Sequence, residues 1–211
     1  NIIYIPDIFI YEESYINSNP KLLFLMKEVN TKKGKKLDLK DFVRNGGRRQ
    51  TWDNIARWIY GIRNINNNLD WSDIEKIKTS DQRKELFKSI IVINLKKSPG
   101  IHTTNDNQLW KITEEDKDYL NKQFKIYFDN IDTKPNLIIA CGSITTGTFN
   151  KLVSISGKVD WKITSRGIWY FEFELGRYFI SYAHPEARVQ DCLLYYGLID
   201  AVRELTIKNA I

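Results

Sequence analysis

The chain has few cysteines and no long hydrophobic run, and both absences exclude whole classes of protein. Only Cys141 and Cys192 occur among the 211 residues, and they do not form a Cys-x-x-Cys pair. Two thiols cannot supply a disulfide framework or a cysteine-only zinc or iron–sulfur site, so we expect reduced thiols in or near the core. No stretch approaches the roughly 20 apolar residues that a membrane span requires. We therefore expect no metal, no cofactor and no membrane partner.

The N-terminal apolar segment, residues 2–10, is interrupted by Pro6 and Asp7 and has no basic leader. Because this pattern differs from that of a secretion signal, we expect a soluble, cytoplasmic protein. A chain of 211 residues that is 42% hydrophobic can bury one substantial core. We expect a single domain over residues 1–211, and a monomer.

The net charge of +6 is concentrated in one segment. Residues 31–50 contain eight basic and two acidic side chains, so their excess equals the net charge of the whole chain. A basic patch on an otherwise neutral protein is the electrostatic footprint of a site for a phosphate backbone or another polyanion. A solvated loop without a specific partner explains the charge equally well. The segment directly follows the first expected strand, and this position favours binding.

Short apolar runs alternate with amphipathic segments along the chain. Runs at Leu22–Met26, Ser89–Asn94 and Pro135–Gly142 predict buried parallel strands. Two aromatic runs, Trp169–Leu175 and Tyr178–Ala183, flank Gly176-Arg177 and predict a hairpin. The expected fold class is α/β, a three-layer α/β/α sandwich with a central, mostly parallel sheet.

The intervening segments predict helices. They are expected to begin at Thr51, to cover Trp71–Lys88, to begin at Thr113 with a capping-box pattern, to lie near Thr146–Val153, and to cover Val189–Lys208. The first helix would direct one stripe to the core, composed of Trp52, Ile55, Ala56, Ile59 and Ile62. The last would direct another, composed of Leu193, Leu194, Leu198, Ile199, Val202 and Leu205.

Polar residues follow each parallel strand. The sets are Glu28 with Asn30, Asn94 with Lys96 and Lys97, Gly142 with Ser143, and His184-Pro185-Glu186. In open α/β sheets the ligand crevice lies beyond the carboxyl ends of the strands. A carboxylate and an imidazole from opposite ends of the chain are therefore candidates for one cleft.

Taken in order, these segments resemble the motifs of the uracil-DNA glycosylase superfamily. Residues 27–31, Lys-Glu-Val-Asn-Thr, resemble the first motif of its Gly-Glu-Ala-Pro-Gly branch. Residues 41–44, Asp-Phe-Val-Arg, resemble the Pro-Phe-Val-Gly segment, and residues 94–99 resemble Asn-Val-Val-Lys-Cys-Arg-Pro-Pro. The His-Pro motif at residue 184 completes a series that runs from about Leu22 to Leu205. The resemblance implies a uracil-DNA glycosylase-like fold.

The resemblance also implies a function, that of a monofunctional DNA glycosylase. Such a hydrolase cleaves the N-glycosidic bond of a flipped-out base in DNA and leaves an abasic site. Glu28 would orient the attacking water and stabilise the sugar cation, and His184 would donate to the charge that grows on the base. Asn94 and Asn30 would contact the base edge, and Phe42 would stack on its face.

DNA is the partner that the resemblance implies, and its phosphates need basic contacts. The candidates are Lys32, Lys33, Lys35, Lys36, Arg48, Arg49, Lys96, Lys97 and Arg188. Binding through such contacts weakens steeply with salt. Arg188 and Val189 also stand where the family places its intercalating loop.

The chain departs from the family pattern in ways that bear on the substrate. Lys27 and Asn30-Thr31 replace the Gly and Pro-Gly of the first motif, the four cluster-binding cysteines are missing, and Glu186 replaces a common Ser. One interpretation is a pocket reshaped for a modified base, such as glucosylated hydroxymethylcytosine in phage DNA, with a role in antiviral defence. The alternative is uracil excision in DNA repair.

Each assignment has a structural alternative. Glu28 is equally a candidate for a strand-end ion pair, Asn94 for a loop cap, and Phe42 for a core anchor. Two other function classes stay open. The first is a non-catalytic DNA-binding module on the same fold. The second is a nucleotide-handling enzyme with phosphate over residues 142–147, a glycine-poor stretch without a P-loop lysine.

Overall fold

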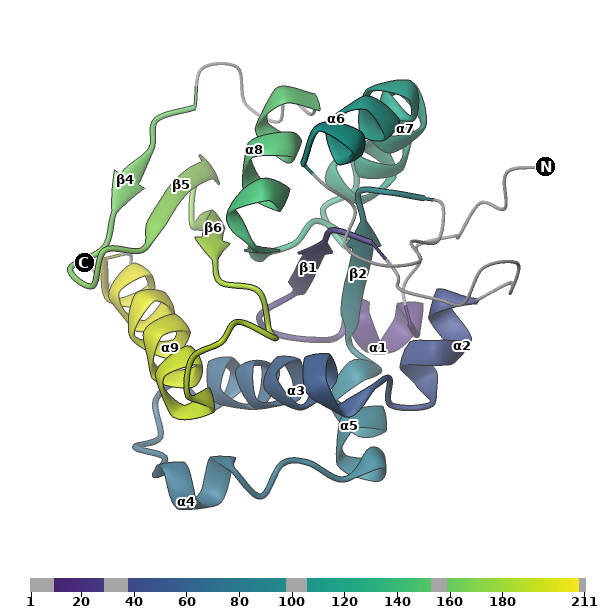
Figure 1. Cartoon of the computed structure of the whole chain (residues 1–211). Coiled ribbons are helices and arrows are strands. Elements are labelled where there is room, and N and C mark those ends of the chain that lie inside the picture. The colour runs from purple at the N-terminus through teal and green to yellow at the C-terminus, as the bar shows by residue number, and fades with distance from the viewer. Residues whose placement is uncertain (1–9, 29–37, 98–105, 153–158, 209–211) are drawn as a thin grey trace.

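The computed structural model describes residues 10–28, 38–97, 106–152 and 159–208 (Figure 1). The strands are β1 (Leu22–Met26), β2 (Ile90–Asn94), β3 (Leu137–Cys141), β4 (Lys162–Ile163), β5 (Trp169–Glu174) and β6 (Arg177–Tyr182). The helices are α1 (Glu12–Ile16), α2 (Leu39–Arg44), α3 (Arg49–Arg63), α4 (Trp71–Ile74), α5 (Ser80–Phe87), α6 (Asp106–Glu115), α7 (Lys117–Phe128), α8 (Ser143–Leu152) and α9 (Asp191–Lys208).

The strands form one mixed, mostly parallel sheet. Its order is β2-β1-β3-β6-β5-β4, with the first four strands parallel and the last two antiparallel to their neighbours. Met26 pairs with Asn94, and Cys141 pairs with Tyr182, so the parallel strands end at one edge of the sheet. The α/β class and the mostly parallel sheet predicted from the sequence are confirmed.

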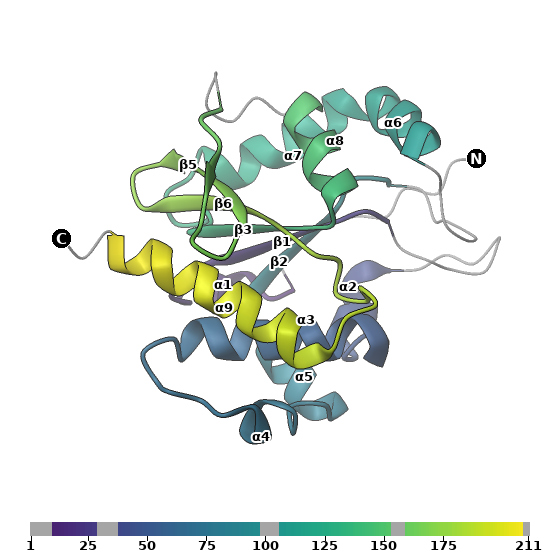
Figure 2. The same ribbon diagram turned by 60° about the vertical axis from the view of Figure 1, so that its left-hand side comes forward.

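Alternation along the strands divides the core between the two faces of the sheet, because successive strand residues point to opposite sides. Leu22, Phe24 and Met26 pack in the cluster that contains α3 and α9. Leu23 and Leu25 pack in the cluster that contains α7 and α8. Figure 2 shows the result, with α6, α7 and α8 on one side of the sheet and α3, α5 and α9 on the other. The molecule therefore has three layers.

Helices α3 and α9 cover one face together. All five members of the predicted α3 stripe are buried. Trp58 is also fully buried in α3, and its indole N–H donates to the carbonyl oxygen of Leu194 in α9, 3.1 Å away. The α9 stripe is buried as predicted, with one exception. Leu193 is 59% exposed, because it lies about 100° around the helix from Leu194 and off the buried stripe.

The predicted start of one helix and the predicted position of the hairpin turn were also wrong. Thr113 does not begin a helix: it is buried inside α6, where its hydroxyl donates to the carbonyl oxygen of Leu109 at 2.8 Å. The following helix, α7, begins at Lys117 instead. The hairpin turn is Leu175-Gly176 rather than Gly176-Arg177, since β6 already begins at Arg177. Gly176 has φ of +71°, a conformation that costs glycine little.

Both cysteines are free thiols, with Cys141 buried at the end of β3 and Cys192 partly exposed in α9. Burial raises the pKa of the Cys141 thiol far above its usual range, so this group is un-ionised and behaves as a small apolar side chain. Within the four described ranges, no helix combines the length and apolarity needed to span a membrane. The same residues contain no cluster of three or more His, Cys, Asp or Glu side chains suited to a metal ion.

Candidate active site

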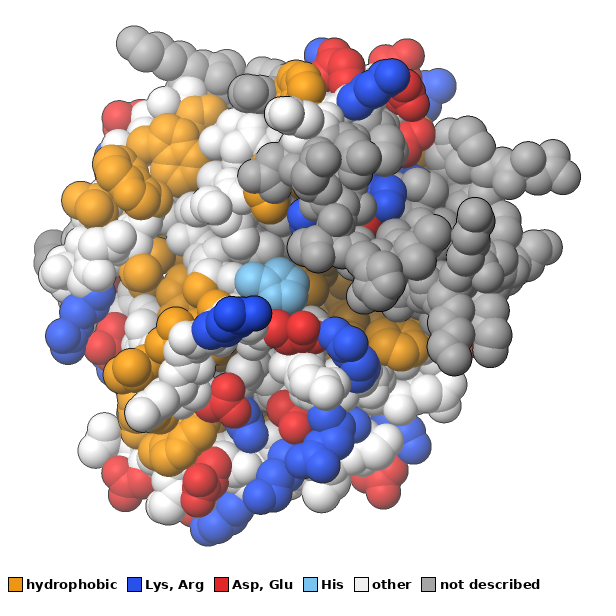
Figure 3. All heavy atoms as spheres, viewed as in Figure 1, with side chains coloured by type: hydrophobic (Ala, Val, Ile, Leu, Met, Phe, Trp, Pro, Cys, Tyr) orange, Lys and Arg blue, Asp and Glu red, His pale blue; other side chains and the backbone are white. Residues whose placement is uncertain are grey.

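A cavity of about 550 Å³ lies at the carboxyl ends of the parallel strands. Its volume falls within the roughly 300–1,000 Å³ typical of small-molecule sites. It is lined by Met26, Lys27, Glu28, Leu39, Phe42, Arg48, Thr51, Trp52, Val92, Asn94, Cys141, Gly142, Ser143, Ile144, His184 and Glu186. In the space-filling view of this face a histidine lies next to a basic and an acidic side chain, both of which border it from below (Figure 3).

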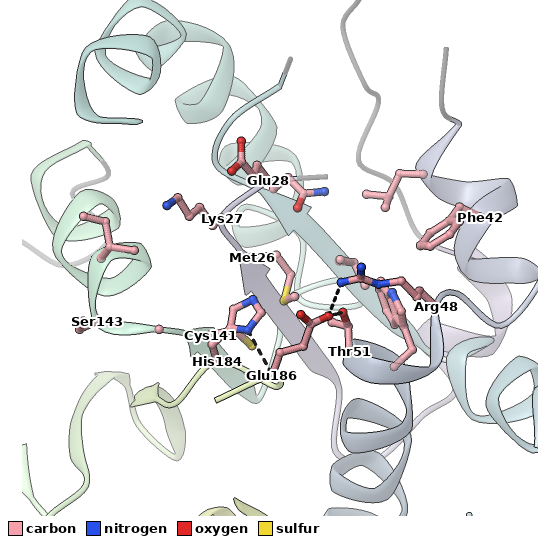
Figure 4. Close-up of a pocket in the computed structure, with 16 residues that line it drawn as sticks. Met26, Lys27, Glu28, Phe42, Arg48, Thr51, Cys141, Ser143, His184 and Glu186 are labelled. Atoms are coloured by element: carbon pink, nitrogen blue, oxygen red, sulfur yellow. Dashed lines mark hydrogen bonds and ion pairs between the residues drawn. The ribbon is translucent and has the colours of Figure 1, made fainter. Parts of the chain in front are cut away.

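The cavity brings together five of the residues singled out from the sequence. Glu28, Phe42, Arg48, Asn94 and His184 all line it, although they come from four separate parts of the chain. Figure 4 shows Glu28 and Lys27 on one side of the space, His184 and Glu186 on another, and Phe42 on a third. Other predicted contacts lie outside the described residues: Asn30, Lys32, Lys33, Lys35 and Lys36.

His184 follows β6 and is partly buried. Its Nδ1 accepts a hydrogen bond from the backbone N–H of Glu186 at 3.1 Å. An accepting Nδ1 carries no proton, so in the neutral ring the proton is on Nε2. Burial lowers the pKa of His184 below 6.5, and the positive charges of Lys27 and Arg48 lower it further, against the opposing effect of Glu186. At neutral pH the side chain is therefore an uncharged imidazole with an Nε2–H donor.

Glu186 occupies the turn that follows His184. Its Oε1 accepts hydrogen bonds from the hydroxyl of Thr51 and from Arg48 Nη2, the latter at 2.5 Å. Burial opposes ionisation, but these two hydrogen bonds and the positive charge of Arg48 outweigh it and lower the pKa of Glu186. The cavity wall thus carries a fixed negative charge beside a neutral histidine.

Glu28 and Lys96 face each other across the ends of β1 and β2. Backbone pairing continues past both strands, because Leu95 N–H donates to the Met26 oxygen and Lys96 N–H donates to the Lys27 oxygen. This continuation places Lys96 Nζ 2.7 Å from Glu28 Oε2, in a pair whose side chains are only 7% and 10% exposed. Glu28 is therefore a nearly buried carboxylate held by a cation.

The next residue, Lys97, is also buried, but it contacts helix α7. Lys97 is completely buried, with Nζ 2.6 Å from Gln123 Oε1 and 5.6 Å from the centre of the Tyr119 ring. The predicted phosphate contacts by Lys96 and Lys97 therefore do not agree with the structure, which directs both ammonium groups to internal partners. For Lys96 the reason is that backbone pairing with the segment after β1 continues to this residue, so it does not lie in an open loop.

The three arginines predicted to contact DNA differ in their exposure and in their partners. Arg48 is half exposed and bonded to Glu186 at the cavity, as described above. Arg49 is 70% exposed and lies 3.6 Å from Asp53, one turn further along α3. Arg188 is exposed in the loop before α9, next to Val189, which is 49% exposed. Arg49 and Arg188 are therefore both accessible to a polyanion.

Asn94 and Phe42 provide the polar and aromatic walls predicted from the sequence. Asn94 is 2% exposed, and it ends β2 with its side chain at the cavity. Phe42 is partly buried in α2, with its ring centre 6.3 Å from that of Trp52 in an edge-on arrangement. An amide and a ring face are the groups that recognise a planar heterocycle by its edge and its face.

One group of residues at this site was missed by the sequence analysis. Asn54 and Arg57 are buried polar residues on α3. Asn54 Nδ2 donates to the carbonyl oxygen of Pro185 at 2.9 Å and to Asp191 Oδ1 at 3.0 Å, and Arg57 Nη1 lies 2.7 Å from Asp191 Oδ2. This arrangement fastens the His184 loop to α3. A polar residue on an otherwise apolar helix stripe was the available signal.

The stretch at residues 142–147 is the start of α8, not an open loop. Gly142 has φ of +105°, and this conformation turns the chain from β3 into the helix. Gly142, Ser143 and Ile144 line the cavity, so the positive end of a ten-residue helix faces the site. This wall can stabilise negative charge that develops in the cavity.

No protein-family model matches the chain, and a search of curated proteins finds no match.

Proposed function

We propose that this protein is a monofunctional DNA glycosylase. The observation that supports the proposal is the shared cavity, which a carboxylate, an amide and an imidazole line at the carboxyl ends of three parallel strands. The proposed fold relationship, with the uracil-DNA glycosylase superfamily, rests on the motif resemblance together with this convergence. The proposed partner is DNA, reached through Arg49, Arg188 and the basic segment of residues 31–50.

In the proposed reaction the bond between C1′ of the sugar and the base nitrogen breaks, and the base takes the electron pair. Positive charge develops on the sugar and negative charge on the base. The Nε2–H of His184 is suited to donate to a base oxygen as this charge grows, because a neutral donor stays protonated throughout. The start of α8 lies at the same cavity and favours negative charge there.

Glu28 would act on the other reactant. Water adds to C1′ as the base leaves, and its released proton goes to the Glu28 carboxylate. Lys96 holds that carboxylate at 2.7 Å and keeps it oriented. The negative charge of Glu28 also stabilises the developing sugar cation. Asn94 would read the base edge and Phe42 would stack on its face.

We further propose a modified base as substrate, such as a glucosylated hydroxymethylcytosine in phage DNA, with uracil in a repair role as the alternative. The cavity of about 550 Å³ offers room for a substituted base. The ionised Glu186 in its wall offers an acceptor for hydroxyl or amino donors. Both features favour a base that carries polar substituents.

The Glu28–Lys96 ion pair favours a second candidate function, a DNA-binding module without catalysis. A carboxylate that is 10% exposed and bound to a lysine also fits a purely structural role. In that case Glu28→Gln would leave function intact. In a glycosylase the same change abolishes turnover and leaves DNA binding in place.

The decisive experiment is strand cleavage by alkali after incubation with end-labelled oligonucleotides. These carry uracil, hypoxanthine, hydroxymethylcytosine or glucosylated hydroxymethylcytosine at one position. Wild type is compared with Glu28→Gln and with Glu174→Gln, which alters an equally short ion pair, to Lys134 at 2.7 Å, outside the cavity. The expected result is cleavage at one base that Glu28→Gln loses and Glu174→Gln keeps. Absence of cleavage on every substrate, with salt-sensitive DNA binding intact, would favour the binding module.

A further inference from the structure

Helix α5 contacts the corner between α2 and α3, and this corner forms one wall of the cavity. Five residues of the corner line the cavity: Leu39, Phe42, Arg48, Thr51 and Trp52. Figure 4 shows Phe42 and Arg48 on the same side of the cavity, with Lys27 and Ser143 on the other side. None of the eight residues of α5, all of which the structure describes, lines the cavity itself. Contacts from α5 therefore act on the cavity only through the corner.

Three residues on one face of α5 make these contacts. Ser80, Arg83 and Phe87 are spaced by three and four residues, which places them on the same side of the helix. The Ser80 hydroxyl donates to the Asn45 carbonyl oxygen at 3.4 Å, and the Phe87 ring centre lies 5.1 Å from that of Trp52. Arg83 lies between them and is only 5% exposed. This face of α5 thus holds the corner both at its backbone and at an aromatic ring.

Arg83 supplies the charged contacts of this face. Its Nε donates to the Gly46 carbonyl oxygen at 2.6 Å, and its Nη1 donates to Asp53 Oδ1 at 2.5 Å and to the Lys78 carbonyl oxygen at 2.8 Å. Gly46 lies just after α2, and Asp53 lies in the second turn of α3. The Arg83 and Asp53 side chains are 6% and 13% exposed, so water has little access to the pair. Because the guanidinium is planar and its donors are fixed, one side chain holds the end of α2 against the start of α3.

Gly47 connects this corner to the aromatic residues of the cavity. The Trp52 ring lies directly on Gly47, and a Cβ atom there would be less than 3.0 Å from three atoms of the ring. The same ring is edge-on to Phe42, with 6.3 Å between the ring centres. The Gly47 N–H also donates to the Phe42 carbonyl oxygen at 3.0 Å. The position of Phe42 is therefore set by two contacts, one to the Gly47 backbone and one to the Trp52 ring.

We propose that Arg83 is a positioning residue, which holds the corner through Gly46 and Asp53 and thereby sets the position of the Phe42 ring in the cavity wall. Since Phe42 is the residue proposed to stack on the base, α5 would determine how tightly the cavity binds a planar group. This consequence for binding rests on the proposed glycosylase function, whereas the position of the ring does not. If Arg83 only stabilised the fold, every folded molecule would keep the Phe42 ring in place without it.

The test is fluorine NMR of 4-fluorophenylalanine placed at residue 42, which reports the surroundings of that one ring. A second sample carries the label at residue 128, because Phe128 packs in the core on the opposite face of the sheet. Spectra are compared for wild type, Arg83→Met and Arg83→Lys. Lys keeps a positive charge beside Asp53, but its single nitrogen cannot replace both Nε and Nη1 of the arginine. If Arg83→Met fails to fold, Arg83→Lys decides.

Gly47→Ala tests the link to Trp52 without a change at Arg83. Its matched control is Gly167→Ala, because both glycines have a positive φ, +60° at Gly47 and +81° at Gly167. At Gly167 no atom of the described residues, apart from its chain neighbours, lies within 4 Å of the position that a Cβ would take. Both substitutions strain a backbone that favours glycine, but only Gly47→Ala forces an atom against the Trp52 ring.

The expected result is a changed fluorine shift at residue 42 in Arg83→Met, Arg83→Lys and Gly47→Ala, with the shift at residue 128 unchanged in each. Gly167→Ala should match wild type at both positions. An unchanged shift at residue 42 in folded Arg83→Lys would overturn the proposal. Equal changes at residues 42 and 128 would also overturn it, because they would indicate a general loosening of the fold.

Activity is read separately. If the glycosylase assay succeeds, Arg83→Lys should raise KM about tenfold and change kcat by less than about twofold, as expected when substrate and transition state lose the same stacking contact. A purely structural role would instead reduce the active fraction, and hence kcat, at an unchanged KM. Base excision by wild type with an unchanged shift at residue 42 in Arg83→Lys would refute the positioning role and leave the proposed function standing. A changed shift without any base excision by wild type would do the reverse.

Discussion

Two walls of the cavity each hold one carboxylate against one cation, but they do so in different surroundings. On the β1–β2 wall, Glu28 and Lys96 are 10% and 7% exposed. On the wall formed by α3 and the turn after β6, Glu186 and Arg48 are 30% and 52% exposed. The first pair is nearly removed from water and the second borders it.

The difference in burial determines how much stability is lost when one partner of each ion pair is removed. Loss of one partner from a buried pair leaves a charge that water cannot solvate, which costs much more than the pair itself contributes. A half-exposed arginine keeps access to water and to salt, so its contribution is small and screened. Arg48 is therefore available to exchange Glu186 for a phosphate, whereas Lys96 is committed to Glu28.

The largest effect should come from Lys96→Met, which tests how firmly the β1–β2 wall depends on its cation. We expect the free energy of unfolding to fall by about 3 kcal/mol, because the nearly buried Glu28 side chain loses the cation that lies 2.7 Å from it. Urea denaturation measures the change. Lys134→Met removes the cation of a more exposed pair with Glu174, and we expect a loss below about 1 kcal/mol. Equal losses in the two variants would contradict the comparison.

The next effect should come from Asn54→Ala, which detaches the other wall from α3. Asn54 is 4% exposed, and its amide bonds Pro185, Asp191 and Arg57. Unpaired buried groups cost about 1–3 kcal/mol each, so we expect a loss of about 2 kcal/mol in the free energy of unfolding. Asn64→Ala is the control, since Asn64 is only partly buried and its side chain bonds locally, to Tyr60 and Asn67. A loss no greater than that of Asn64→Ala would show that this wall does not depend on Asn54.

A smaller effect should appear in the pH dependence of stability. The pKa of His184 is lowered below 6.5 in the folded state, chiefly by burial, so the unfolded chain binds the proton more tightly. The stabilising contribution of the neutral His184 side chain is then fully present above pH 6.5. It is lost as the pH falls from 6.5 through the lowered pKa of His184. In His184→Gln this loss should disappear. Urea denaturation at a series of pH values measures it, and equal slopes for wild type and variant over that interval would refute the interpretation.

Glu186 contributes in a different pH range. Its pKa is lowered below 4.5 by the Thr51 and Arg48 hydrogen bonds, which outweigh burial, so its contribution is present above pH 4.5 and is lost as the pH falls through the lowered pKa. Glu186→Gln should therefore change the profile only below pH 4.5, apart from its weaker effect on His184. His184→Gln and Glu186→Gln therefore distinguish the contribution of His184 to stability from that of Glu186.

The smallest effect on stability should come from Arg48→Gln, within about 0.5 kcal/mol, because the side chain borders water. Its effect on DNA binding is the sharper measurement. If Arg48 exchanges Glu186 for a phosphate, the slope of log affinity against log salt should decrease by about one, the change expected for a lost phosphate contact. Arg49→Gln, at an exposed neighbouring position, provides the comparison. An unchanged slope in Arg48→Gln alone would mean that Arg48 stays with Glu186.

Much of this arrangement was predictable from local sequence. Leu22–Met26 has the predicted bounds, and Ile90–Asn94 differs by one residue, because short apolar runs in a buried parallel sheet leave little choice of structure. The sequence also predicted that Glu28 and His184 lie at one cleft, since parallel strands that start in register end at the same edge of the sheet. Strand ends therefore indicated the site before any side-chain geometry was known.

The remaining features depend on contacts between distant segments. Lys96 reads as a solvated loop residue, and only its pairing with Lys27 across the sheet makes it the partner of Glu28. Asn54 reads as an interruption of an apolar stripe, and its partner Pro185 lies 131 residues away. Leu193 reads as core, but the packing of α3 against Leu194 sets the rotation of α9. No local pattern encodes such choices.

The position of β6 has a consequence for how the chain assembles. Among the strands of the described residues β6 comes last in sequence, yet it lies inside the sheet, between β3 and β5. Until residues 177–182 are in place, β3 has an unpaired edge and the wall that carries His184 does not exist. Pairing of β6 with β3 closes a loop of about 40 residues, and such long-range closures are slow steps in folding. Fragments that stop before β6 therefore lack the cavity wall that carries His184, and they expose a β-edge prone to aggregation.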